Sequence, residues 1–130
     1  MPAARKAPSK ANADFKPVFA ALQQILKPYE GRLKAVHDNP DYYYLETHEP
    51  TYKNRRMFFA AVRTGRNYVS YHLMPVYGIP ELQKSISPAL KKRMQGKACF
   101  NFTQVDEACF KELAALTKEG FAKFKNIKFI

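Results

Sequence analysis

The feature that most constrains the fold is a pair of apolar segments near the middle of the chain. Residues 57–64, "MFFAAVRT", and residues 67–74, "NYVSYHLM", are joined by Gly65-Arg66. Alternating apolar residues around a two-residue link with Gly predict a β-hairpin with one buried side. With Thr64 opposite Asn67, the predicted core-side pairs are Phe58 and Leu73, Ala60 and Tyr71, and Val62 and Val69. The predicted pairs on the other, more polar side are Phe59 and His72, Ala61 and Ser70, and Arg63 and Tyr68.

The rest of the chain predicts elements that can cover the buried side of this hairpin. A helical stripe of apolar residues follows a possible cap at Asp14, with Pro17 in its first turn, and Pro28 and Gly31 end it. A period of two over residues 32–47, broken by the turn at 38–41, predicts another hairpin. The further predicted elements are short helices over 81–85 and 88–94, a strand over 98–102 with Phe100 and Phe102 inward, and a long helix that begins at Thr103-x-x-Asp106.

This element order predicts an α+β fold. An antiparallel sheet of about five strands is packed on one face by an N-terminal and a C-terminal helix, with two short helices between strands four and five. The 130 residues suit one domain, predicted over 13–126, with a disordered basic tail at 1–12 and a C-terminal tail at 127–130. The longest apolar run has six residues, 57–62, so no membrane partner is expected, and no secretory signal is found. A cytoplasmic protein is the expectation.

Charge is the most unusual property of the composition. The formal net charge is +11, and between residues 53 and 97 ten basic residues accompany one acidic residue, Glu81. Such a surface attracts anionic partners. Tyrosines beside arginines in this region have the ingredients of a stacking platform for single-stranded nucleic acid, although no known nucleic-acid-binding signature is present. The candidate polyanion-binding residues are Arg55, Arg56, Arg63, Arg66, Lys91, Lys92 and Arg93.

Ser70 and His72 raise a question of chemistry, because they alternate on one side of a strand. A serine nucleophile needs a base within hydrogen-bonding distance and an acid that orients the base, and neither strand of that hairpin has an acidic residue. No enzyme motif is found, so we expect a protein that is not an enzyme and has no cofactor. The predicted ligand site is a cleft between the polar sheet side and residues 75–94, with Phe59, Ser70, His72 and Tyr77 as ligand-binding residues.

Two further groups of residues could form a functional site, although a structural role also explains each of them. Glu46 and His48, with Glu49, could hold a metal ion at the end of a strand, although a polar strand end explains them as well and no metal ligands are assigned. Cys109 lies near the start of the last helix, where a thiol pKa can be lowered, but it also belongs to the apolar stripe. We expect Cys99 and Cys109 to be reduced.

Four motifs follow one another between residues 57 and 120: "MFFAAV" leads into "YVSYHL", and then come "QGKACFNF" and the helix "FKELAALTKEGF". On these motifs the segment resembles the YdhG-like family of small bacterial domains. The resemblance implies the same α+β fold, and for this chain we expect a binding protein for a small ligand or a protein partner. Because a family member that resembles frataxin has been proposed as an iron carrier, the resemblance also implies iron binding or delivery as an alternative function.

Overall fold

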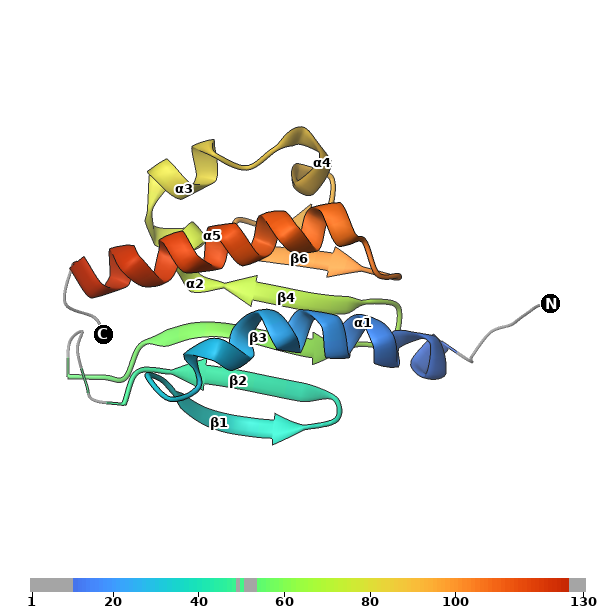
Figure 1. Cartoon of the computed structure of the whole chain (residues 1–130), viewed down its shortest axis with the longest axis horizontal. Helices are drawn as coiled ribbons and strands as arrows, with labels where there is room; N and C mark the ends of the chain where they lie inside the picture. The colour runs from blue at the N-terminus through green and yellow to red at the C-terminus, as the bar shows by residue number, and fades with distance from the viewer. Residues whose placement is uncertain (1–10, 49, 51–53, 127–130) are drawn as a thin grey trace.

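The computed structural model describes residues 11–48, 50 and 54–126, and it consists of helices packed on one antiparallel sheet (Figure 1). No described helix is long and apolar enough to cross a membrane. The elements are α1 (Ala11–Leu26), η1 (Lys27–Tyr29), β1 (Lys34–Asn39), β2 (Tyr42–Glu46), β3 (Phe58–Thr64), β4 (Val69–Leu73), α2 (Met74–Gly78), α3 (Pro80–Lys84), α4 (Pro88–Lys91), β5 (Met94–Gln95), β6 (Cys99–Phe102) and α5 (Glu107–Asn126).

The sheet has six strands in the order β1-β2-β3-β4-β6-β5, and every neighbouring pair is antiparallel. The predicted α+β class is therefore confirmed. Besides the predicted short helices, which correspond to α3 and α4, the structure has a further short helix, α2, and a two-residue edge strand, β5.

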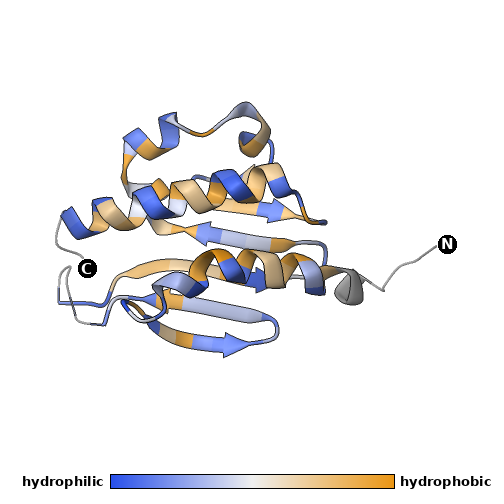
Figure 2. Ribbon diagram, viewed as in Figure 1, coloured by the Kyte–Doolittle hydropathy of each residue, from blue (hydrophilic) through white to orange (hydrophobic). Residues whose placement is uncertain are grey.

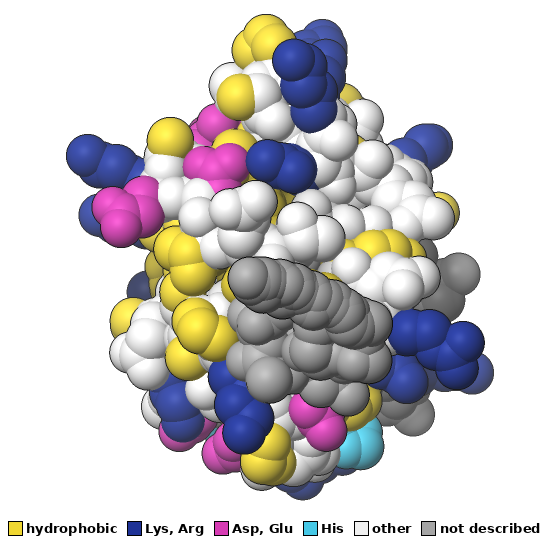
Figure 3. Space-filling view, turned by 90° about the vertical axis from the view of Figure 1, so that its right-hand side faces the viewer, with side chains coloured by type: hydrophobic (Ala, Val, Ile, Leu, Met, Phe, Trp, Pro, Cys, Tyr) yellow, Lys and Arg dark blue, Asp and Glu magenta, His cyan; other side chains and the backbone are white. Residues whose placement is uncertain are grey.

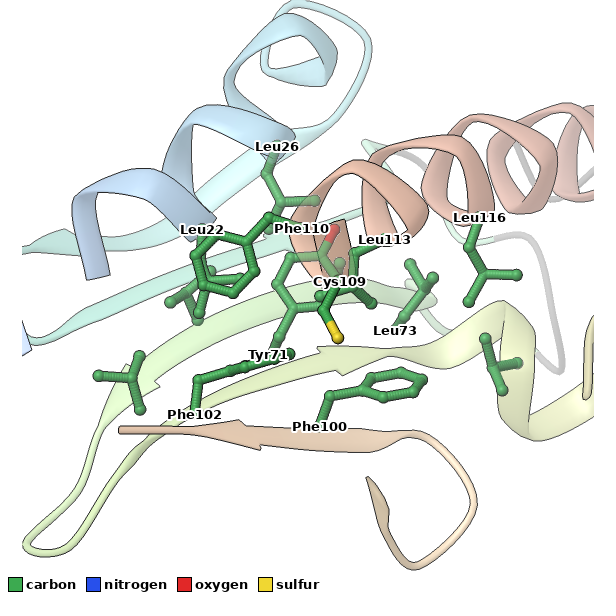
Figure 4. Packing of buried hydrophobic residues seen from close by; sticks show 14 of the residues in the cluster. Leu22, Leu26, Tyr71, Leu73, Phe100, Phe102, Cys109, Phe110, Leu113 and Leu116 are labelled. Atoms are coloured by element: carbon green, nitrogen blue, oxygen red, sulfur yellow. The ribbon is translucent and has the colours of Figure 1, made fainter. Parts of the chain in front are cut away.

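Both long helices cover the same face of the sheet. α1 and α5 contact each other, and α1 also contacts β3 and β4 (Figure 1). Each long helix has both hydrophobic and hydrophilic residues (Figure 2), as expected when one side of a helix is buried. Side chains from the two helices meet Tyr71, Phe100 and Phe102 of the sheet in one core (Figure 4). Phe100 and Phe102 are inward, as predicted.

The central hairpin forms, but its register differs from the prediction by two residues. Thr64 pairs with Val69, and the Gly65 N–H donates to the Tyr68 carbonyl at 2.8 Å, so the tight turn is Arg66-Asn67 rather than Gly65-Arg66. His72 therefore lies opposite Ala61, and Ser70 opposite Arg63. Because a shift of two residues keeps each side chain on its own side of the sheet, the predicted sides of β4 are correct.

A β-bulge at the start of β3 reverses the predicted sides of Phe58 and Phe59. Leu45 pairs with Ala60 but Glu46 pairs with Phe58, so Phe59 has no partner of its own on β2. Phe59 is fully buried against α5. The centre of its ring lies 5.8 Å from that of Phe121 and 5.7 Å from that of Phe124. Phe58 instead stacks on Tyr44 on the opposite side of the sheet. One extra residue in one strand is enough for this reversal.

The helix ends also differ in detail from the sequence prediction. α1 begins at Ala11, so the predicted tail of residues 1–12 loses its last two residues to the helix, and Pro17 lies inside the helix rather than in its first turn. α5 begins after Asp106, whose carboxylate accepts the Cys109 N–H at 3.1 Å as an N-cap. This bond lowers the pKa of Asp106. The predicted tails at 1–10 and 127–130 lie outside the described residues.

Candidate functional site

The face of the sheet away from α1 and α5 has half-exposed polar and aromatic side chains; we call it the open sheet face. In β2, β4 and β6 the buried residues of the alternation point toward the helices, and the residues between them are half-exposed on the other side. The residues of the open sheet face used below are Tyr42, Tyr44, Phe58, Ala61, Arg63, Ser70, His72, Gln95, Cys99 and Asn101.

Strand pairing arranges eight of these side chains in two neighbouring rows that run across four strands. One row is Tyr42, Arg63, Ser70 and Asn101, and the other is Tyr44, Ala61, His72 and Cys99. Directly paired residues on one side of an antiparallel sheet have their Cβ atoms about 4.5–5.5 Å apart, so neighbours in a row can interact. Each row therefore begins with a tyrosine and ends with small polar side chains.

The β1–β2 end of the open sheet face is aromatic. The rings of Tyr44 and Phe58 stack with centroids 4.8 Å apart, and Tyr42 meets Tyr44 edge-on at 6.0 Å. On the outer side, His37 of β1 stacks on Tyr42 at 4.6 Å. The Arg63 guanidinium lies 5.3 Å from the centre of the Tyr42 ring, within the range of a cation–π interaction. A fixed positive charge thus adjoins a row of half-exposed rings.

The β4–β6 end is a hydrogen-bonded polar network. Asn101 Oδ1 accepts from the Ser70 hydroxyl at 2.7 Å and from the Cys99 thiol at 3.4 Å, while Asn101 Nδ2 donates to Gln95 Oε1 at 2.8 Å. The Tyr68 hydroxyl also donates to Gln95, at 3.3 Å. These bonds fix the orientation of the Asn101 amide at the centre of the network.

Cys99 and His72 form a pair at the edge of this network, with Sγ and Nε2 3.6 Å apart. Burial and the nearby Arg63 charge lower the pKa of His72, in that order of size. Burial raises the pKa of the Cys99 thiol. Both shifts favour the neutral forms at neutral pH, whereas a reactive cysteine needs its thiolate. Cys109 is a buried free thiol whose pKa is also raised by burial.

The structure separates the four predicted ligand-binding residues. Ser70 and His72 lie on the open sheet face, but Phe59 is in the core on the other side because of the bulge. Tyr77 is 57% exposed in α2. Helices α2, α3 and α4 all contact α5, which covers the opposite face of the sheet, so the predicted cleft between Ser70, His72 and residues 75–94 does not form.

The seven predicted polyanion-binding residues are also not brought together. Arg55 and Arg56 precede β3, Arg66 follows it, and a strand of this length separates its ends by about 20 Å. Arg93 lies 3.5 Å from Asp106, and Arg56 lies 4.0 Å from Glu46. Lys91 and Lys92 belong to the end of α4, beside α5. Of the seven, Arg63 is the residue that the strand register places on the open sheet face.

Sequence reasoning did not predict that Cys99, Asn101 and Gln95 would join Ser70 and His72. The signal was present, because Phe100 and Phe102 point inward and their neighbours must then point outward. The missing information was the strand order, in which β6 lies next to β4 although three helices and β5 separate them in the chain.

Among the described residues, no group of three or more His, Cys, Asp or Glu side chains is placed to hold a metal ion. Glu46 is near Arg56 instead, and Glu49 of the predicted strand-end cluster lies outside the described residues.

No family model matches the chain, and no significantly similar curated protein or solved structure was found. The resemblance to the YdhG-like family and the iron binding that it implies stay predictions. The fold and the site define a two-layer α+β protein in which two long helices cover one sheet face and an aromatic, basic and polar surface occupies the other.

Proposed function

We propose that the protein binds single-stranded nucleic acid on the open sheet face, without catalysing a reaction. The observation that carries this proposal is the Arg63 guanidinium, which lies over the Tyr42 ring beside the half-exposed rings of Tyr44 and Phe58. Aromatic rings can stack on any base, and an arginine beside them supplies charge for a phosphate. A binding role also suits the neutral, unactivated state of Cys99 and His72.

The charges of the surface support an anionic partner. Strands β2, β3, β4 and β6 contain one acidic residue, Glu46, and Arg56 lies 4.0 Å from it. None of the ion pairs between described residues includes Arg63, which is exposed. A phosphate group therefore meets a positive charge that no described carboxylate neutralises.

The polar network gives the partner a second kind of contact. Ser70 lies opposite Arg63 on the neighbouring strand, and Asn101 lies opposite Ser70 one strand further. Together with Gln95 of β5, which accepts a hydrogen bond from Asn101, they supply a hydroxyl and two amides on the same face as Arg63. Such groups can hydrogen-bond the edges of bases that stack on the tyrosine end, because unpaired bases expose their hydrogen-bonding edges. The expected binding is tolerant of sequence, since stacking distinguishes bases weakly.

Fluorescence anisotropy with a labelled oligo-deoxythymidine tests this proposal. A length of about 12 nucleotides is within the range that such surfaces bind. Tyr44→Leu removes one stacking ring, and the expected loss is about 5- to 100-fold in affinity. Arg63→Gln removes one phosphate contact, and the expected slope of log affinity against log salt falls by about 0.7.

Lys118→Gln is the matched control, because Lys118 is an exposed lysine on α5, across the sheet from the site. It changes the net charge as much as Arg63→Gln does and should leave the affinity close to that of the unmodified protein. Absence of binding at low salt, or equal losses for Arg63→Gln and Lys118→Gln, would contradict the proposal. Thermal unfolding of each variant checks that the fold is retained.

A further inference from the structure

A separate cavity lies between the short helices and the β5–β6 turn. Its volume is about 320 Å³, at the lower end of the range for small-molecule sites. Its walls come from α3, from the segment that leads into α4, and from the chain around β5. Because α3 and α4 pack against α5 on the helix-covered side, this cavity is distinct from the open sheet face.

Three lysines from three different segments border the cavity. Lys84 ends α3, Lys91 ends α4, and Lys97 belongs to the turn between β5 and β6. The lining contains no acidic residue, and none of the ion pairs between described residues involves these three lysines. In Figure 3, basic side chains lie beside apolar ones at the upper end of the molecule, where α4 is placed. Three unneutralised ammonium groups around one hollow favour an anion with more than one negative charge.

The cavity also has apolar walls. Ile86 is 6% exposed, and Met94 is a half-buried residue packed against the core. These side chains offer an apolar surface to a ligand, and burying apolar area contributes about 25 cal/mol per Å². An inorganic ion would leave this surface uncovered.

One wall of the cavity is tied to α2. The Gln83 side-chain amide donates to the carbonyls of Val76 at 2.8 Å and of Tyr77 at 3.3 Å. The Lys97 ammonium lies 5.9 Å from the centre of the Tyr77 ring. Tyr77 therefore contacts two residues of the cavity lining, Gln83 and Lys97, and lies apart from Ser70 and His72.

We propose that this cavity binds a small organic dianion, namely a phosphate monoester whose organic part is apolar and about the size of one ring. The lysines hold the phosphate, and Ile86 and Met94 pack against the organic group. This site is additional to the proposed nucleic-acid surface and does not depend on it.

Isothermal titration calorimetry with phenyl phosphate, inorganic phosphate and benzyl alcohol tests the proposal. Phenyl phosphate has both the charge and the ring, and each of the other two compounds lacks one of them. We expect phenyl phosphate to bind on the order of tenfold more tightly than inorganic phosphate, since covering about 60 Å² of apolar surface gives that ratio. Benzyl alcohol is expected to show no binding.

A pair of triple variants separates the cavity from the general charge of the protein. Lys84→Gln/Lys91→Gln/Lys97→Gln should abolish phenyl phosphate binding. Lys111→Gln/Lys118→Gln/Lys125→Gln removes the same charge from exposed positions of α5 and should retain it. All six lysines are exposed, so both variants should fold, which circular dichroism checks.

Absence of phenyl phosphate binding, or equal binding to the two triple variants, would overturn the proposal. Equal affinities for phenyl phosphate and inorganic phosphate would overturn the role of Ile86 and Met94. Because Arg63→Gln leaves the cavity intact, it should bind phenyl phosphate normally, so failure of the nucleic-acid proposal and failure of this one are distinguishable.

Discussion

At the scale of single residues, one hydrogen bond inside the core should contribute measurably to stability. The hydroxyl groups of Tyr71 on β4 and Thr117 on α5 lie 2.6 Å apart, and both residues are fully buried. Burial raises the pKa of Tyr71, so the phenol stays protonated. This bond links the sheet to the C-terminal helix within otherwise apolar packing.

Tyr71→Phe should therefore lower the free energy of unfolding by about 1–3 kcal/mol, because the buried Thr117 hydroxyl loses this partner. Tyr71→Phe/Thr117→Val should recover much of that loss, since neither polar atom then remains buried. Urea unfolding of Tyr71→Phe, Thr117→Val and the double variant measures the effect. A double variant that is as unstable as the sum of the two single variants would contradict this explanation.

His72 should make stability depend on pH. Its pKa in the folded protein is lower than the usual value of 6.5, mainly because the imidazole is half-buried and also because Arg63 is near. The unfolded chain therefore takes up a proton first as the pH falls below about 6.5, and the free energy of unfolding should decrease there.

Urea unfolding at about pH 7.5 and about pH 5.5 checks the contribution of His72. His72→Gln should show a smaller decrease between these conditions than the unmodified protein. His37→Gln, which changes an exposed histidine on the edge strand β1, is the control and should retain the full decrease. Equal decreases for the two variants would exclude the role of His72.

At the scale of elements, close packing between α5 and α2 depends on a glycine. A Cβ atom at Gly120 would lie 2.8 Å from Cβ and 3.0 Å from Cγ of the buried Pro75 ring. Alanine favours a helix over glycine by about 1 kcal/mol, but overpacking a rigid ring costs about 1–3 kcal/mol. Gly120→Ala should therefore destabilise the fold despite its better helix propensity.

Thermal unfolding of Gly120→Ala and Gly31→Ala compares a glycine that has close neighbours with one that has none. An added methyl group at Gly31 meets no atom within 4 Å, so Gly31→Ala should be neutral or stabilising by up to about 1 kcal/mol. A Gly120→Ala variant that is more stable than the unmodified protein would show that the α5–α2 contact can relax.

The elements also show which parts of the structure sequence patterns can predict. The period of two placed Val69, Tyr71 and Leu73 in the core, and Ser70 and His72 on the opposite side, despite the error in register. The bulge at Phe59 was not predictable, because two neighbouring phenylalanines fit either side of a strand equally well. The polar network of the site depends on β6 lying beside β4, and strand order has no local signal in the sequence.

At the scale of the whole molecule, the net charge of +11 should make stability and binding respond to salt in opposite directions. The ion pairs between described residues all have at least one substantially exposed side chain and contribute little. Salt therefore mainly screens the repulsion between positive charges, and Tm should rise between about 10 mM and about 150 mM NaCl. Over the same range the proposed nucleic-acid binding should weaken.

Differential scanning calorimetry at these salt concentrations measures the response. Lys111→Gln/Lys118→Gln/Lys125→Gln has a lower net charge and should show a smaller rise in Tm. A fall in Tm with added salt would instead show that the ion pairs stabilise the folded protein more than repulsion destabilises it.

The position of α5 in the chain has a consequence for synthesis on the ribosome. Strands β1 to β4 can pair as successive hairpins while α1 covers part of their apolar side, but Tyr71, Phe100 and Phe102 also need α5. At roughly 5–20 residues per second, about one to five seconds separate the end of β6 from the end of α5. During this interval the nascent chain exposes an incomplete core, and chaperones that recognise apolar strands can bind it.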